Sequence, residues 1–344
     1  MATIGNLYMR RSLKDTGDLA WNPAAAQSPD ILPWSVGQQT DLATFFAANY
    51  DTDPSRAILP GHQNFIYVRA KNIGESAATG NIFLYQAPSS MVLYPELWSG
   101  NPIKSSSGKT SVEVPSTQPD KVGVGREGFV WTPPVPTGRE HYCFVSRVDT
   151  KETVTELKSV KTLDDLALLL VQGQLTSRNV LFVEATAPQV AVSTGYMQGE
   201  EAADLRFMAT CRNCPIDGTA FIQFTSREKL PDGSRVNIAK TKITKQNFVV
   251  GTDAIIPADW KSDFDIDYWS KNPSNGPDWK IEFHAVKVVE NPQHAVYKYG
   301  RTLAEWGWSD ALYAGDGPVK SSAAQESAKL VLVGAATLVN SRIL

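Results

Sequence analysis

The segment His141-Tyr142-Cys143-Phe144-Val145-Ser146-Arg147-Val148 is rich in aromatic and β-branched residues and changes character from one residue to the next. Successive side chains of a β-strand point to opposite faces of a sheet. One face would carry Tyr142, Phe144 and Ser146, and the other Cys143, Val145 and Arg147. The segment therefore predicts a strand, and the same texture recurs on both sides of it.

Upstream, two further segments of this kind lie close together in the chain. Phe65 to Gly74 and Gly80 to Gln86 are separated by five residues, a connection short enough for a β-hairpin. The first sixty residues are instead rich in turn-forming Pro, Asp and Asn, which favours an irregular lead-in. The first half therefore predicts an antiparallel sandwich behind an irregular N-terminal segment.

Downstream, strand-like segments follow one another at short, regular intervals. Turn sequences such as Pro215-Ile216-Asp217-Gly218 and Leu230-Pro231-Asp232-Gly233 separate some of them. The predicted strands are Gln189 to Ser193, Asp204 to Thr210, Thr219 to Ser226, Arg235 to Thr244, Asn247 to Gly251, Trp279 to Val289 and Ala295 to Tyr299. This spacing favours a second sandwich over alternating strands and helices.

A single helix is expected between the two halves, over residues 162–172. Thr162 can cap its N-terminus with Asp165 three residues later, and Gly173 is suited to end it. The predicted fold class is thus mainly β, with two antiparallel β-sandwich domains and one short linking helix. The first domain would span residues 1–180 and the second residues 181–344, since 344 residues suit two domains better than one.

The composition of the chain bears on nucleic-acid binding, on membrane insertion and on localisation. The formal net charge of −3 and the lack of a Lys/Arg block leave no basic surface for nucleic acid. The longest apolar run, Leu330 to Val339, is about half of the ~20 residues that a membrane helix needs, so it predicts a core strand and no transmembrane segment. No signal peptide is visible after Met1, which leaves localisation open between the cytoplasm and export by a route without a cleavable signal.

Several motifs of the first half, taken in order, resemble a bacterial immunoglobulin-like module of the cell-adhesion-related, CARDB-like kind, over about residues 8–182. They are Leu13 to Asp18, Ser28 to Ile31, Tyr67 to Gly74, Ile82 to Tyr85, Phe129 to Pro134, His141 to Val148 and Ser177 to Val180. The resemblance implies a seven-stranded sandwich without catalytic residues, attached to secreted, surface or toxin-associated proteins. The second half resembles no family that we recognise.

Cys211 and Cys214 have the spacing of a zinc knuckle or a redox dithiol. A structural zinc site needs four ligands, and Cys143 is the only other cysteine in the chain. A redox pair would have its first thiol at a helix N-terminus, whereas this pair lies between predicted strands. A pair of free thiols is favoured, while a disulfide between Cys211 and Cys214 and a zinc site both stay open.

Asp263, Asp265 and Asp267 alternate with apolar residues. On a strand the three carboxylates would share one face, at a spacing of about 6–7 Å that suits a hard cation such as Ca²⁺. A solvated strand face is the alternative. The order of residues excludes an EF-hand, because no Glu follows at the twelfth position.

Trp260, Trp269 and Trp279 bracket this acidic segment. Exposed aromatic rings beside acids can stack on sugars or anchor a protein contact, so the three define a candidate binding surface. The alternative is that each ring belongs to the core.

The sequence carries no nucleophile elbow, zinc-protease motif or phosphate loop. We therefore predict a non-enzymatic interaction or structural protein without a cofactor. It would be an accessory or adhesion component of a bacterial secreted or toxin-associated assembly, with other proteins as partners. One alternative is a carbohydrate- or Ca-dependent binding module. The other is a hydrolase whose site is dispersed in the sequence and includes His284 with a carboxylate and a hydroxyl.

Overall fold

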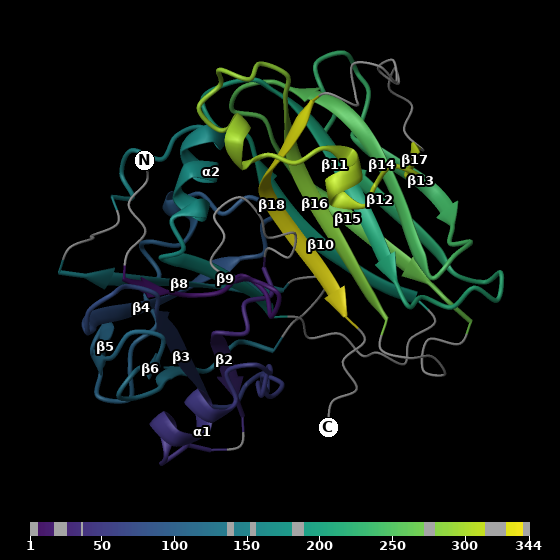
Figure 1. Ribbon diagram of the computed structural model, residues 1–344. Coiled ribbons are helices and arrows are strands. Elements are labelled where there is room, and N and C mark those ends of the chain that lie inside the picture. Colours follow the sequence, from purple (N-terminus) through teal and green to yellow (C-terminus); the bar gives the residue numbers. More distant parts are fainter. Residues whose placement is uncertain are drawn as a thin grey trace.

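The chain folds into two antiparallel β-sandwiches that pack against each other, as Figure 1 shows. The structure is a computed structural model that describes residues 6–16, 26–35, 37–135, 141–151, 156–180, 189–271, 279–313 and 328–339. The mainly β fold class predicted from the sequence is confirmed.

The first sandwich is built from the strands before residue 181. One sheet has β3 at its centre, and the other has the order β5-β4-β8-β9. The first sheet contains β1 (Leu7–Tyr8), β2 (Ile31–Trp34), β3 (Asn64–Asn72), β6 (Val122–Val124) and β7 (Phe129–Trp131), and the second contains β4 (Ala78–Pro88), β5 (Ser111–Thr117), β8 (Tyr142–Thr150) and β9 (Leu175–Val180). The described residues thus form nine strands, two more than the resemblance implies.

The second sandwich follows from residue 189 onward. Its sheets have the orders β10-β15-β12-β13 and β17-β14-β11-β16-β18, and in them the short β14–β17 pair alone is parallel. The strands are β10 (Gln189–Met197), β11 (Ala203–Arg212), β12 (Phe221–Ser226), β13 (Asn237–Lys242), β14 (Asn247–Ile256), β15 (Lys261–Trp269), β16 (Lys280–Val289), β17 (Leu312–Tyr313) and β18 (Lys329–Val339). The apolar run Leu330 to Val339 is therefore a core strand, as predicted.

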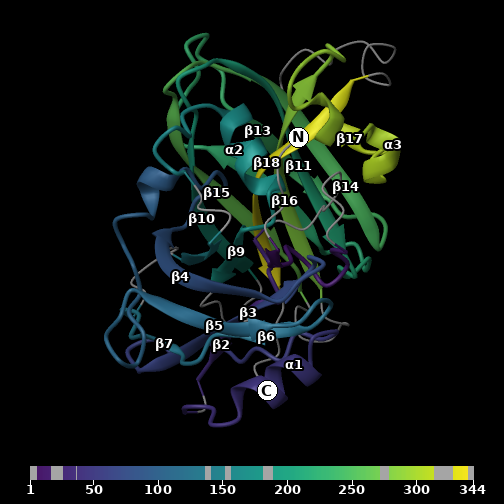
Figure 2. The same cartoon turned by 60° about the vertical axis from the view of Figure 1, so that its left-hand side comes forward.

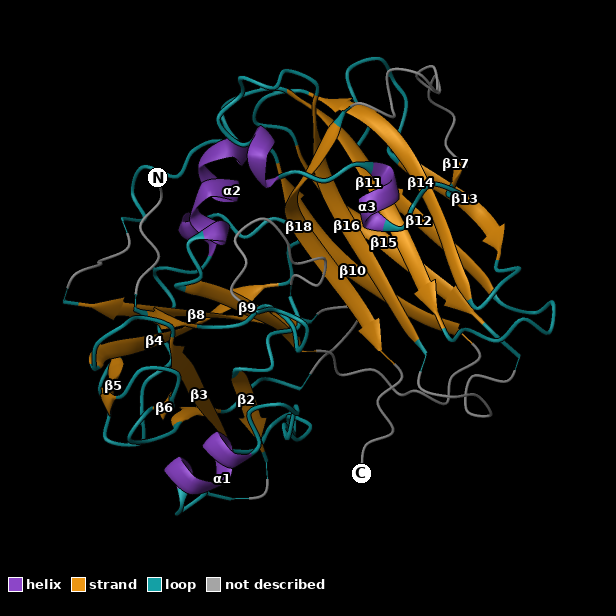
Figure 3. Cartoon of the chain, viewed as in Figure 1, coloured by secondary structure: helices purple, strands orange, loops and turns teal. Residues whose placement is uncertain are grey.

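Helices are few and short (Figure 3). The described residues contain α1 (Leu42–Ala48), α2 (Leu163–Val171) and α3 (Leu303–Trp306), with short 3-10 turns at Pro95–Leu97 and Tyr297–Tyr299. The predicted linking helix is α2, and its reciprocal Thr162–Asp165 capping box is present. No helix of the described residues has the length and apolar character needed to span a bilayer.

Three expectations about local structure need correction. The lead-in is irregular only in part, because it supplies β1, β2 and α1. The expected single helix is accompanied by α1 and α3, each of which begins with a side-chain cap, Asp41 and Thr302 respectively. The predicted strand Ala295 to Tyr299 is replaced by a 3-10 turn.

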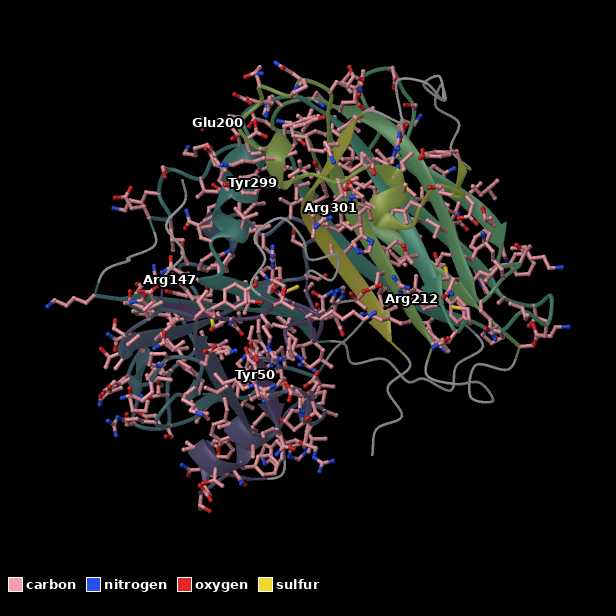
Figure 4. All side chains as sticks on the ribbon, viewed as in Figure 1. Tyr50, Arg147, Glu200, Arg212, Tyr299 and Arg301 are labelled. Carbon is pink, nitrogen blue, oxygen red and sulfur yellow. The ribbon has the colours of Figure 1, made fainter. Side chains whose placement is uncertain are left out.

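A buried ionic network explains why the lead-in is ordered. Asp30 accepts hydrogen bonds from Arg10 Nη2 at 2.7 Å and from Arg69 Nε at 2.9 Å, and all three side chains are at most 5% exposed. Arg69 donates its remaining hydrogen bonds to backbone carbonyls of residues 29–52. Tyr50, labelled in Figure 4, lies with its ring 3.4 Å from the Arg10 guanidinium. Buried charges require such complete pairing, so this network fixes the lead-in on β3.

The two sandwiches share an apolar core. Cys143 and Val145, on the β8 face that points away from the first core, join the cluster that fills the second sandwich. Helix α2 contributes Leu163, Leu166 and Leu169 to the same cluster, and Figures 1 and 2 show it above β9 of the first sandwich and beside β18 of the second. The outer face of the first domain is thus buried by the second.

The segment Ser89–Val92, which leaves the end of β4, connects both sheets of the second sandwich. Met91 N–H donates to the Gly195 carbonyl on edge strand β10, and Gly195 N–H donates to the Ser89 carbonyl, each at 2.8 Å. On the other sheet, Ala335 N–H of edge strand β18 donates to the Met91 carbonyl at 2.9 Å. We call Ser89–Val92 the bridging segment, because it closes the gap between the two sheet edges.

Glycine is required where the bridging segment meets β18. A Cβ at position 334 would lie 2.7 Å from the carbonyl carbon of Met91 and closer still to its oxygen. Polar contacts add to the junction elsewhere: Lys161 pairs with Glu200 at 2.8 Å, and Lys287 pairs with Asp164 at 2.6 Å. The sandwiches therefore form one packed unit.

Candidate binding site

A hollow of about 510 Å³ lies where the end of the β4–β8 ladder meets β10 and β15. Its lining comes from both sandwiches. The residues are Pro88, Ser89, His141 and Tyr142 from the first, and Ser193, Gly195, Arg227 and Asp263 from the second. This junction hollow has a volume within the usual range of small-ligand sites.

A hydroxyl–imidazole contact forms the inner wall of the junction hollow. Ser89 Oγ lies 2.5 Å from His141 Nε2 and 3.0 Å from Thr194 Oγ1 of the second sandwich. Burial lowers the pKa of His141 to about 4, so the ring is neutral at pH 7. The contact joins the two domains through neutral polar groups.

The same contact has the distance that a serine nucleophile and its base require. A base of this kind needs a third group, usually a carboxylate, to orient the ring. Among the described residues no carboxylate contacts Nδ1 of His141, and the interaction that opposes the lowering of its pKa comes from the backbone of Ser193. The described geometry therefore supports a structural contact better than a catalytic pair.

Asp263 and Arg227 line the outer wall. Asp263 belongs to the exposed face of β15, and we call Asp263, Asp265 and Asp267, together with Arg227, the acidic face. Arg227 donates to both carboxylate oxygens of Asp265, at 2.7 and 3.0 Å, and to Asp263 at 3.2 Å. The hydrogen bond to Asp265 raises the pKa of Arg227. As predicted, the three acids share one face of a strand.

The position of Arg227 bears on the predicted calcium site. The guanidinium of Arg227 occupies the position between Asp263 and Asp265 where a cation would bind, and Asp267 accepts from Gln189 at 3.0 Å. Among the described residues, no group of three or more His, Cys, Asp or Glu side chains is arranged to hold a metal ion. Calcium binding stays a prediction that requires Arg227 to move.

The three tryptophans do not form one surface. Trp279 is 2% exposed and packs on Tyr268 at a centroid distance of 4.6 Å, so its assignment to a binding surface was wrong. Trp260 packs against the shared core and donates to the Lys229 carbonyl. Trp269 lies on the outer face of the sheet, with the Lys240 ammonium 3.9 Å from its ring.

Cys211 and Cys214 are buried free thiols, so of the alternatives left open by the sequence the structure has the pair of free thiols and not the disulfide. Cys211 lies at the end of β11, and a hydrogen bond to Cys214 and burial together raise its pKa well above the usual value. A thiol of raised pKa in an apolar core is a poor nucleophile and metal ligand.

His284 lies on β16, whereas the strands β10 and β15 that border the junction hollow belong to the other sheet of the second sandwich. Its ring packs 5.4 Å from Trp308 and 5.8 Å from Trp306, beneath two stacked indoles. Glu282, two residues earlier on the same strand, is engaged by Arg212 at 3.2 Å and Lys280 at 2.7 Å. The carboxylate near His284 therefore already has cationic partners. Figure 4 shows Arg212 near the edge of this sandwich.

No family model and no curated protein matches the chain. Loose similarities to solved structures exist. A red sea bream transglutaminase has a TM-score of 0.21 at 13% identity, and the match covers 67% of this chain and 28% of that one. The S. aureus collagen adhesin has a TM-score of 0.17 at 10% identity, with 76% and 89% coverage. The Enterococcus faecalis MSCRAMM ACE has a TM-score of 0.19 at 9% identity, with 70% and 88% coverage. Superpositions this loose support no argument about fold or function.

Among the lining residues, sequence reasoning identified Asp263 alone as a site residue. The polar contributors that it missed are Ser89, His141, Ser193 and Arg227. They lie in four separate segments and meet only because the bridging segment holds the sandwiches together. The one available signal was the acidic strand, whose exposed carboxylates require a cationic neighbour.

Proposed function

We propose that this chain is a non-enzymatic binding protein, an adhesion or accessory component of a bacterial secreted or toxin-associated assembly. Its two sandwiches form one rigid body that presents the acidic face and the junction hollow to a protein partner. The observation that carries the proposal is the bridging segment, which is hydrogen bonded to edge strands of both sheets of the second sandwich.

Rigidity at this junction matters for binding. Domains joined by small polar contacts normally move relative to each other, and a partner that contacts both must then order them. Here the apolar core is continuous across the junction. A surface composed of residues from both sandwiches is therefore preorganised for a partner.

Two further observations support a binding role. The first half resembles a CARDB-like adhesion module, and two of the motifs that carry this resemblance are Ser28 to Ile31 and Tyr67 to Gly74. These two motifs contain Asp30 and Arg69, which form a buried ion pair. The serine–histidine contact lacks an orienting carboxylate among the described residues, which disfavours a hydrolase. A carbohydrate ligand is the second candidate, because the partly exposed ring of Trp269 lies on the same sheet face as the acids.

The test is retention of a partner by the immobilised full chain from extracts of the bacterium that produces it. The variants are Arg227→Ala and Trp269→Ala, and the matched control is Glu113→Ala, an exposed strand position on the first sandwich. We expect one protein to be retained by the wild type and the control and lost with the face variants. Retention by all four proteins, or ester hydrolysis abolished by Ser89→Ala, would contradict the proposal.

A further inference from the structure

The inner wall of the junction hollow is closed by contacts within the protein. The buried His141 ring lies 2.5 Å from Ser89 Oγ and also contacts the backbone of Ser193. Ser89 Oγ is hydrogen bonded in addition to Thr194, at 3.0 Å. These polar groups are therefore already engaged in the contact between the sandwiches, and a ligand of the hollow has to take its hydrogen bonds from the outer wall.

The outer wall carries an acceptor and a donor with capacity for further hydrogen bonds. Asp263 accepts at its Oδ2 from Arg227, at 3.2 Å, and among the described residues none donates to its Oδ1. Arg227 uses three of the five N–H groups of its guanidinium, two on Asp265 and one on Asp263, so two remain for a ligand. The side chains of Arg227 and Asp263 are 45% and 54% exposed, so a ligand in solution can reach both.

Gly195 leaves Asp263 accessible from the hollow. The two residues are partners in the β10–β15 register, and both line the hollow. A Cβ at position 195 would lie 3.8 Å from Asp263 Oδ1 and 3.1 Å from the carbonyl oxygen of Ser89. Because glycine has no side chain there, Oδ1 borders the hollow.

The charges of the lining favour a neutral ligand. Arg227 and Asp263 carry opposite charges, and the His141 ring is neutral at pH 7. A charged ligand would therefore meet a like charge beside every opposite one. A hydroxyl group suits the pair, because it can donate to the carboxylate and accept from the guanidinium at the same time.

The first sandwich adds an apolar surface to the hollow. Pro88 and Tyr142 form the last pair of the β4–β8 ladder, and both line the hollow. The partly exposed Tyr142 ring is held by an edge-to-face contact with Trp131, at a centroid distance of 5.5 Å. An aromatic ring whose orientation is fixed in this way can stack against the C–H groups of a sugar ring.

We propose that the junction hollow binds a neutral sugar unit, with hydroxyl groups hydrogen bonded to Asp263 and Arg227 and one face of the sugar ring on Tyr142. This inference deepens the second candidate of the proposed function, a carbohydrate ligand, and rests on it. It places the sugar in the hollow rather than on the open sheet face around Trp269. The sugar unit belongs either to a free saccharide or to a glycan of the partner.

The experiment measures binding of the methyl glycosides of glucose, galactose, mannose, fucose and N-acetylglucosamine to the full chain by saturation-transfer difference NMR. We expect at least one glycoside to bind with a Kd of about 1–10 mM, a range that suits a ligand of this size. Its strongest signals should come from C–H protons on one face of the sugar ring.

Asp263→Asn removes the charged acceptor and keeps its shape, while Arg227 stays paired with Asp265. We expect this variant to raise the Kd about tenfold. Glu113→Gln is the matched control, because Glu113 is also an exposed strand carboxylate paired with an arginine, Arg126 at 3.4 Å, and its Kd should equal that of the wild type.

The inference is overturned if no glycoside of the panel binds, or if Asp263→Asn binds as tightly as the wild type. Loss of binding with Trp269→Ala but not with Asp263→Asn would also overturn it, since the sugar would then lie on the open sheet face.

Retention of the partner tests the proposed function separately. Release of the retained partner by the bound glycoside would show that the partner carries the sugar unit, and retention in its presence would show that the hollow binds a free saccharide; both results support the site. A partner that is lost with Arg227→Ala, while no glycoside binds, leaves the proposed function intact and removes the sugar site.

Discussion

Substituting Gly334 by alanine should uncouple the bridging segment from β18. The new Cβ would lie 2.7 Å from the Met91 carbonyl carbon, a backbone atom that cannot rotate away. Relief requires Met91 to shift, which breaks the 2.9 Å hydrogen bond from Ala335 N–H to the Met91 carbonyl. Overpacking costs about 1–3 kcal/mol and an unsatisfied buried N–H a similar amount. With partial relaxation, we expect the free energy of unfolding to fall by about 3 kcal/mol.

The assay is urea unfolding at 25 °C followed by tryptophan fluorescence. With a urea slope of about 3 kcal/mol per molar, the midpoint should fall by about 1 M. Gly100→Ala is the matched control, because a Cβ there meets nothing within 4 Å, and its midpoint should change little. If Gly334→Ala and Gly100→Ala unfold at the same midpoint, the contact between the bridging segment and β18 does not hold the junction together.

Three other predictions concern charged and titratable groups. Asp30→Asn leaves two buried guanidinium groups without their anion and should lower the free energy of unfolding by about 3–5 kcal/mol, measured by the same urea assay. Burial lowers the pKa of His141 from 6.5 to about 4, so its contribution to stability is complete above pH 6.5 and is lost as the pH falls toward 4. The loss should amount to about 3 kcal/mol in unfolding curves at a series of pH values and be absent from His141→Gln; an unchanged pH slope in the variant would refute it. Calcium at about a millimolar should raise the Tm of Arg227→Ala more than that of the wild type, since the guanidinium no longer fills the site; equal shifts would remove Asp263 and Asp265 from consideration as ligands.

The strands were predictable because their signal is local. In β8 and β15, alternating residues face a core on one side, and this period is visible without knowledge of neighbouring strands. The α2 helix was predictable for the same reason, since Thr162 and Asp165 form its cap within four residues. Helix α1 was missed because its seven residues lie among turn-forming residues and are held by packing of Phe46 against Tyr67.

The candidate site was mostly not predictable, because it depends on how the two sandwiches are placed. Cys143 and Val145 lie on one of the two faces of β8, and nothing in the neighbouring sequence indicates that the second sandwich covers this face. Trp279 was grouped with the acidic segment because it follows it in the sequence, but its side chain is buried in the core just before β16. Contacts such as Ser89 with Thr194 span more than a hundred residues, so they follow from the packing of whole domains.

The most direct test of a rigid junction is a distance measurement between the sandwiches. Spin labels at Glu113→Cys on β5 and Ala239→Cys on β13 occupy exposed strand positions, while the three native cysteines are buried. Pulsed electron–electron double resonance should give one narrow distribution of distances between the two labels, and Gly334→Ala should broaden it. A broad or bimodal distribution in the unsubstituted background would contradict the claim that the bridging segment and the shared core hold both sandwiches as one body.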